Sequence, residues 1–223
     1  MKRFHSPAAF ASSLDGVARR GAISKGCLIG LAVAGALVLG LVVLLWGGYN
    51  SLVGTQEDAR QKWAQVENQY KRRFELVPNL VETVKGAANF EQETIQNVTQ
   101  ARASVGRVQL PAGLPTDQAQ LDEFGKAQAQ LGGALSRLLV VSEQYPQLRA
   151  TENFRTLQDQ LEGTENRIAV AREDYTRAVA SYNKSVRTFP KNLLANAFNF
   201  PPLPQFTAPA EEQVVPKVDF GAK

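Results

Sequence analysis

A run of 20 residues without a charged or strongly polar side chain, from Cys27 to Trp46, constrains this chain more than any other feature. At about 1.5 Å rise per residue, a helix of that length spans about 30 Å, which is the hydrocarbon thickness of a bilayer. Such a helix satisfies its own backbone hydrogen bonds, so lipid accepts it. We therefore predict a transmembrane helix over residues 26–47. The residues assigned to this anchor are Leu28, Gly30, Ala36, Gly40 and Trp46.

Two other interpretations of the run are a buried core helix and a cleaved signal peptide. A core helix is seldom so uniformly apolar at this length. A signal peptide has an apolar stretch of roughly 7–15 residues followed by a small-x-small cleavage site. Here the run is longer, and residues 44–47 (LLWG) offer no such site. An uncleaved anchor is favoured.

Charge is distributed unevenly along the chain. The whole sequence has a net charge of +4, and all of it belongs to residues 1–46, because residues 47–223 are neutral. The basic tail, residues 1–25, predicts a cytoplasmic N-terminus by the positive-inside rule. The expected location is the cell (inner) membrane, single-pass, with the body outside the cytoplasm and periplasmic where there are two membranes. A neutral body lacks the basic field that phosphate binding requires, so nucleic acid is excluded as a partner.

The inventory of reactive side chains is small. The chain has one Cys and one His, which excludes an internal disulfide framework and a zinc or iron–sulfur centre. We predict no catalytic, cofactor-binding or metal-binding residue. An enzyme with an unrecognised site is the alternative.

Past Gly48 the apolar residues recur at helical steps of three and four. They predict a helix over about residues 49–85 that continues through Pro78, a second over 90–105, a third after Thr116 or Asp117, and a long fourth helix. Six of the eleven prolines lie in residues 190–223, which predicts an extended tail that also carries Phe side chains. The expected fold is all-α: a single transmembrane helix, an antiparallel four-helix-type bundle over residues 48–189, and a Pro-rich tail over 190–223.

The fourth helix carries apolar residues at intervals of seven, which is typical of a coiled-coil seam. These residues are Phe154, Leu161, Ile168, Tyr175, Tyr182 and Phe189. The seam can form either the core of the body's own helices or an interface with another chain. Core is the favoured interpretation.

Small residues also follow a four-residue spacing in the apolar run. Gly26 and Gly30 are followed by Ala32, Ala36 and Gly40. Such stripes let transmembrane helices approach closely, so the pattern indicates a homo-oligomer.

Polar residues gather near Pro78 and on the fourth helix. They are Arg72, Arg73, Asn79, Glu165 and Arg172. A functional interpretation makes them a polar site between the two long helices. The favoured interpretation is a set of interhelical ion pairs and hydrogen bonds that set the register of the helices.

Long stretches of the sequence resemble the LemA family of bacterial membrane proteins. The resemblance rests on YNSLV at 49–53, RRFELVPNLVETVKG at 72–86, ARA at 101–103, ENF at 152–154, GTENRIAVAR at 163–172 and PKVDF at 216–220. It covers about residues 45–223. It implies a single-pass anchor carrying a helical bundle, without an established enzyme activity. The long stretch before the span, residues 1–25, departs from the family pattern.

Together these observations favour a non-enzymatic, membrane-anchored helical scaffold of the bacterial cell envelope. We expect it to bind the lipid bilayer, to self-associate and to organise or shape the membrane. The alternative is an adaptor or sensor that binds another envelope protein, such as a membrane protease, through the bundle or the tail.

Overall fold

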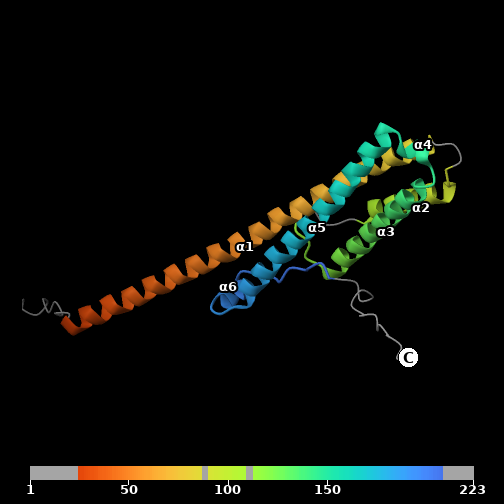
Figure 1. The fold of residues 1–223 in the computed structure, drawn as a ribbon. Coiled ribbons are helices and arrows are strands. Elements are labelled where there is room, and N and C mark those ends of the chain that lie inside the picture. The colour runs from red at the N-terminus through yellow and green to blue at the C-terminus, as the bar shows by residue number, and fades with distance from the viewer. Residues whose placement is uncertain (1–24, 87–89, 109–112, 208–223) are drawn as a thin grey trace, which may run out of the picture. The chain divides into compact units, whose positions relative to one another are not determined.

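The computed structural model describes residues 25–86, 90–108 and 113–207, so the basic tail 1–24 and residues 208–223 lie outside the described part (Figure 1). Its helices are α1 (Lys25–Lys85), α2 (Gln92–Arg107), α3 (Gln118–Ser142), α4 (Pro146–Arg149), α5 (Glu152–Arg187) and α6 (Lys191–Ala197). Within these described ranges there is no strand. The predicted all-α fold is confirmed.

The helix boundaries follow local chemistry. Asp117 caps α3, accepting a hydrogen bond from the Ala119 backbone N–H at 2.9 Å, in the place predicted from sequence. Thr151 caps α5 in the same way through the Phe154 N–H. As expected, α1 continues through Pro78.

The chain divides into two compact units, residues 1–46 and 47–223, and the bundle belongs to the second. In the bundle, α5 runs antiparallel to α1. Residue numbers fall along one helix as they rise along the other: Lys62 pairs with Asp174 at 3.2 Å, and Arg73 pairs with Glu165 at 2.8 Å.

The other two long helices complete an up-and-down bundle. α2 returns along α1, where Arg102 reaches the Phe74 carbonyl. α3 then runs in the direction of α1, because Phe124 packs on Tyr70 and Gln128 meets Arg73. Helices α2 and α3 also pack on each other.

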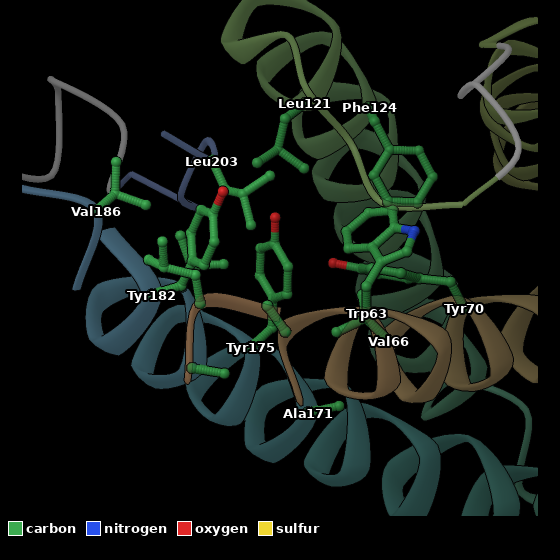
Figure 2. Close-up of a cluster of buried hydrophobic side chains, with 14 of the residues drawn as sticks. Trp63, Val66, Tyr70, Leu121, Phe124, Ala171, Tyr175, Tyr182, Val186 and Leu203 are labelled. Carbon is green, nitrogen blue, oxygen red and sulfur yellow. The ribbon is translucent and has the colours of Figure 1, made fainter. Parts of the chain in front are cut away.

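The bundle core consists of two separate clusters. The first is rich in aromatic residues, and we call it the aromatic cluster; several of its members appear in Figure 2. Its large buried members are Leu52, Trp63, Val66, Tyr70, Leu121, Phe124, Ile168, Tyr175, Val179, Tyr182, Val186, Leu194 and Leu203.

The second cluster, called the aliphatic cluster, occupies the other half of the bundle. Its buried members are Val77, Leu80, Val81, Val84, Phe90, Val98, Leu131, Leu135, Leu138, Leu148, Phe154 and Leu161. Both clusters take residues from α1, α3 and α5, so they follow one another along the bundle.

The segment after α5 is described as far as Thr207. The sequence predicted an extended tail from Pro190, whereas residues 191–197 form α6, residues 198–199 form a turn and residues 200–207 have no regular secondary structure. We call residues 199–207 the strap. The Asn183 side chain donates to the Leu203 carbonyl at 2.9 Å and accepts from the Leu203 N–H at 2.8 Å. Gln118 makes the same pair of bonds with Gln205.

Candidate functional site

A buried arginine lies between the two clusters. Arg73 of α1 is only 3% exposed, with the aromatic cluster before it on α1 and the aliphatic cluster after it. Its Nη1 donates to both carboxylate oxygens of Glu165 on α5, at 2.8 and 3.0 Å. Its Nη2 donates to the Gln128 backbone carbonyl on α3 at 3.0 Å and to the Gln128 side-chain oxygen. We call Arg73, Gln128 and Glu165 the arginine layer.

This layer joins three helices at one level. A buried charge is tolerated only when it is paired and hydrogen-bonded, because its desolvation cost is large. Glu165 supplies the counter-charge from a side chain that is 42% exposed, while Gln128 is buried at 4% exposure. Sliding α1 or α5 by one turn would separate the guanidinium from Glu165, and sliding α3 would remove the two Gln128 acceptors. All of these contacts are made together at the register of α1, α3 and α5 seen here.

Two aromatic rings and a second arginine adjoin the layer. The Arg73 guanidinium lies 5.2 Å from the centre of the Tyr70 ring. Burial raises the pKa of Tyr70, and the positive charges of Arg172 and Arg73 partly offset this effect. Arg172 in turn lies 4.6 Å from the Phe206 ring of the strap. Phe206 stacks on Trp63, so the polar contacts continue into the aromatic cluster.

The structure brings together some of the five polar residues singled out from sequence. Arg73 and Glu165 are in direct contact, and Arg172 interacts with the neighbouring Tyr70. Arg72 and Asn79 instead lie on the exposed side of α1. Arg72 is one residue from Arg73, which is about 100° around a helix with 3.6 residues per turn, so the two cannot share a face.

Gln128 was missed in the sequence, although a signal for it was present. The apolar stripe of α3 runs through Leu121 and Phe124 and resumes at Leu131. Gln128 occupies the inward position between Phe124 and Leu131. A polar residue inside an apolar stripe predicts a buried partner for it.

A second missed contact explains how α1 tolerates Pro78. Proline has no N–H, so the carbonyl four residues earlier, that of Phe74, loses its usual helical donor. Arg102 of α2 donates its Nε–H to this carbonyl at 3.4 Å. Its guanidinium also lies 3.9 Å from the centre of the Phe74 ring. Arg102 thus takes over the role of the missing backbone donor and ties α2 to α1.

The seven-residue seam of α5 faces the bundle along most of its length. Phe154, Leu161, Ile168, Tyr175 and Tyr182 are all buried, divided between the two clusters. The sixth position, Phe189, is wrong as a seam residue. Helix α5 ends at Arg187, so Phe189 leaves the helical repeat, and its side chain is 75% exposed.

The anchor residues lie on the first part of α1. Leu28 is 54% exposed and Trp46 is 71% exposed. A methyl group built on Gly30 or Gly40 would meet no atom within 4 Å. The helix is long and apolar enough to cross a membrane, and the residues that the structure describes bury none of its most apolar window.

Reactive clusters are not found in the described ranges. No group of three or more His, Cys, Asp or Glu side chains there has the proximity needed to hold a metal ion. A surface hollow of about 880 Å³ along α2 is lined by Lys85, Phe90, Ile95, Arg107 and polar amides, without a described carboxylate. The described lining of this hollow therefore offers no pair of carboxylates for general acid–base catalysis.

These features define a class: helical-bundle proteins with an N-terminal helix able to cross a membrane. The LemA family model matches residues 62–220, and the chain belongs to the LemA family. The resemblance stated from the sequence motifs is confirmed.

Curated relatives agree with this assignment. Magnetosome protein MamQ 2 of Paramagnetospirillum magneticum is 29% identical over 192 residues, covering 78% of this chain and 70% of the relative. Magnetosome protein MamQ of Magnetospirillum gryphiswaldense is 27% identical, covering 76% and 68%. Protein LemA of Metamycoplasma hominis is 24% identical, covering 80% and 78%. These names state no enzymatic activity.

Proposed function

We propose that the protein is a non-enzymatic, membrane-anchored scaffold of the cell envelope. In this proposal it self-associates through its N-terminal helix and organises or shapes the membrane. The orientation follows the charge bias, with the N-terminus cytoplasmic and the bundle outside the cytoplasm. The observation that carries the proposal is the apolar first part of α1, whose most apolar window is not buried by any of the described residues.

The packing of the bundle supports a structural role. Its core is filled by two apolar clusters, and its buried charge, Arg73, is neutralised by a partner on another helix. A site for chemistry normally combines a cavity with titratable groups that face into it. The described bundle residues instead use their polar groups to hold helices together. A rigid body of this kind suits presentation at a membrane surface.

Self-association is assigned to the small residues of the span. Gly30 and Gly40 leave open space on the helix surface, and close approach of backbones is what drives many transmembrane pairs. Ala36 and Gly40 lie four residues apart and share one face. We expect a second copy to pack there.

The test is the mass of the full-length protein in mild detergent, measured by light scattering. Wild type should be a defined oligomer, and the variant Ala36→Leu/Gly40→Leu should be a monomer. The matched control is Ala34→Leu/Gly35→Leu, which replaces the same residue types at positions that both point away from the face of Ala36 and Gly40. A monomeric wild type would exclude self-association, and equal behaviour of the two double variants would exclude this face.

The adaptor function is distinguished by crosslinking in native membranes. One dominant heterologous band with the wild-type protein, in place of a ladder of its own multiples, favours an adaptor over a scaffold.

A further inference from the structure

We propose that the bundle has its own lipid-contacting surface, made of Tyr49, Phe189, Leu193 and Phe198. We call these four residues the interfacial patch. Its partner is the headgroup layer of the same bilayer that the first part of α1 crosses. The inference rests on the membrane anchoring proposed above, and it assigns a second membrane contact to the soluble part of the chain.

The patch is unusually apolar for an exposed surface. Phe189 is 75% exposed, Leu193 60%, Phe198 58% and Tyr49 40%. Single exposed apolar residues are ordinary, but several large ones at one end of a domain indicate an interaction surface. Aromatic side chains are favoured at the boundary between lipid and water.

Packing at the start of the bundle joins Tyr49 to Phe198 and holds α6 against α1. The Tyr49 ring meets the Phe198 ring edge-on, with 5.2 Å between the ring centres. Helix α6 is fixed against α1 by Lys191, whose Nζ donates to the Ser51 hydroxyl at 2.8 Å. Leu194 packs so closely on Gly48 that a Cβ at Gly48 would lie 2.7 Å from its Cδ1. Phe198 is thereby fixed on Tyr49, and Leu193 is carried by the helix that is held against the start of the bundle.

Chain length places the patch close to the bilayer whatever the angle between anchor and bundle. Tyr49 follows Trp46 by three residues. A fully extended chain of three residues spans at most about 11 Å. The headgroup region is itself roughly 5–8 Å thick on each side of the hydrocarbon. Tyr49, and with it the Phe198 ring that packs on it, therefore cannot leave the neighbourhood of the headgroups.

The charge at this end suits an anionic surface. Residues 178–210 contain no Asp or Glu, but they contain Lys184, Arg187 and Lys191. Lys184 and Arg187 lie in the last turn of α5, beside the turn that carries Phe189. Basic side chains close to a membrane surface are attracted by anionic headgroups. Apolar side chains flanked by bases are the usual composition of a surface that lies on lipid.

The experiment uses the full-length protein in vesicles, with Cys27→Ser removing the native thiol. Single cysteines at Leu193 and Phe198 carry an environment-sensitive fluorophore, and lipids spin-labelled near the headgroup act as quenchers. Val170 is the matched control, because it lies on α5 and its side chain is also 60% exposed. A probe at Leu37 reports the anchor itself.

Probes at Leu193 and Phe198 should be quenched severalfold more strongly than the probe at Val170. Equal, weak quenching at all three, together with strong quenching at Leu37 by lipids labelled in the chain, overturns the patch and leaves the anchor intact. Absence of quenching at Leu37 overturns the anchoring and the patch together. A Leu193 probe that is shielded in detergent and unquenched in vesicles identifies a second copy on the patch and also overturns the proposal.

The basic residues are tested separately. Quenching at Leu193 should be stronger in vesicles rich in phosphatidylglycerol than in pure phosphatidylcholine. The variant Lys184→Gln/Arg187→Gln should lose this difference. Equal quenching of the wild type in both lipids overturns the electrostatic part of the proposal.

Discussion

The two halves of the bundle core are built from different side chains and closed in different ways. The aromatic cluster includes Trp63, Tyr175 and Tyr182, whereas the aliphatic cluster consists mainly of Val and Leu. The aromatic half is covered by the strap, which contributes Leu203 and packs Phe206 against Trp63. The aliphatic half is closed by α2 and by short connections between neighbouring helices.

The chemistry of the buried rings explains this difference. A buried tyrosine hydroxyl requires a hydrogen-bond partner, which an aliphatic core cannot supply. The strap supplies one for two of the three buried tyrosines: Tyr175 donates to the Pro204 carbonyl at 3.0 Å, and Tyr182 donates to the Pro201 carbonyl at 2.9 Å. The half nearer the anchor in sequence thus depends on a segment from the far end of the chain. The aliphatic half is closed mostly by residues of helices that are close to one another in the sequence.

Large-to-small substitutions should give the largest effects, and they should show that the aromatic and aliphatic halves are closed independently. Trp63→Ala should lower the free energy of unfolding by about 3–5 kcal/mol, and Leu135→Ala by about 2–5 kcal/mol, because each leaves a cavity. Only Trp63→Ala removes the surface on which Phe206 stacks. Denaturant unfolding of the full-length protein in detergent measures the loss of stability. Limited proteolysis should show early cleavage in the strap of Trp63→Ala but not in the strap of Leu135→Ala. The same cleavage rate in both variants would mean that the strap does not close the aromatic half alone.

The arginine layer between the halves should give the next largest effect. Glu165→Ala leaves the buried Arg73 cation without its counter-charge. This should lower the free energy of unfolding by about 2 kcal/mol, after allowing for the partial exposure of Glu165. Adding Arg73→Met removes the stranded charge and should recover part of that loss. Chemical denaturation of the single and double variants measures both changes.

A double variant no more stable than Glu165→Ala alone would mean that the Arg73 charge is not the source of the cost. The exposed pair of Arg177 and Glu173 is a suitable control, because the side chains are 68% and 69% exposed. Its removal should change stability little.

Alkaline pH should destabilise the aromatic half first. Burial raises the pKa of Tyr175, and also those of Tyr182 and Tyr70, above the ordinary value of 10.0. A raised pKa in the folded state means that the neutral phenol contributes its full stabilisation below about pH 10 and loses it as the pH rises towards the folded-state pKa. Thermal unfolding followed by circular dichroism should therefore show a falling midpoint above about pH 10.

Tyr175→Phe should flatten that decline, even though it weakens the fold at neutral pH by removing the bond to Pro204. Leu135→Ala serves as the control, because it lowers stability without removing an ionisable group. An unchanged alkaline slope in Tyr175→Phe would show that other groups control it.

Much of the architecture was predictable because it depends on local periodicity. The apolar run, the helix over residues 49–85, the Asp117 cap and five seam positions all follow from spacing along one helix. Phe189 was assigned wrongly because spacing alone does not show that α5 ends at Arg187. Helix α6 was missed because the prolines on either side of it dominate the composition.

The strap and the arginine layer depend on contacts between distant segments. Asn183 and Leu203 recognise each other through side-chain amide and backbone groups, and any exposed Asn could have done the same. Arg73 and Glu165 were singled out together. The stripe of α3 marks Gln128 as an inward-facing residue, but its partner could be named only by knowing that α3 lies beside α1 at this level. Local pattern therefore predicts which residues turn inward, and tertiary packing decides what they meet there.

The smallest effect we expect concerns Pro78, at the boundary between the two halves. Arg102→Ala should cost about 1 kcal/mol, because the Phe74 carbonyl loses a donor that Pro78 does not provide. In a Pro78→Ala background the residue at 78 has its own N–H, which restores the ordinary helical bond to that carbonyl.

Arg102→Ala should then cost less, so a double-mutant cycle on the unfolding free energy should give a coupling of up to about 1 kcal/mol. Strict additivity would mean that Arg102 stabilises the bundle only through its contact with the Phe74 ring, because that contact is unaffected by the residue at 78. A positive coupling would instead show that a side chain from α2 replaces a backbone bond of α1 at the junction of the aromatic and aliphatic halves.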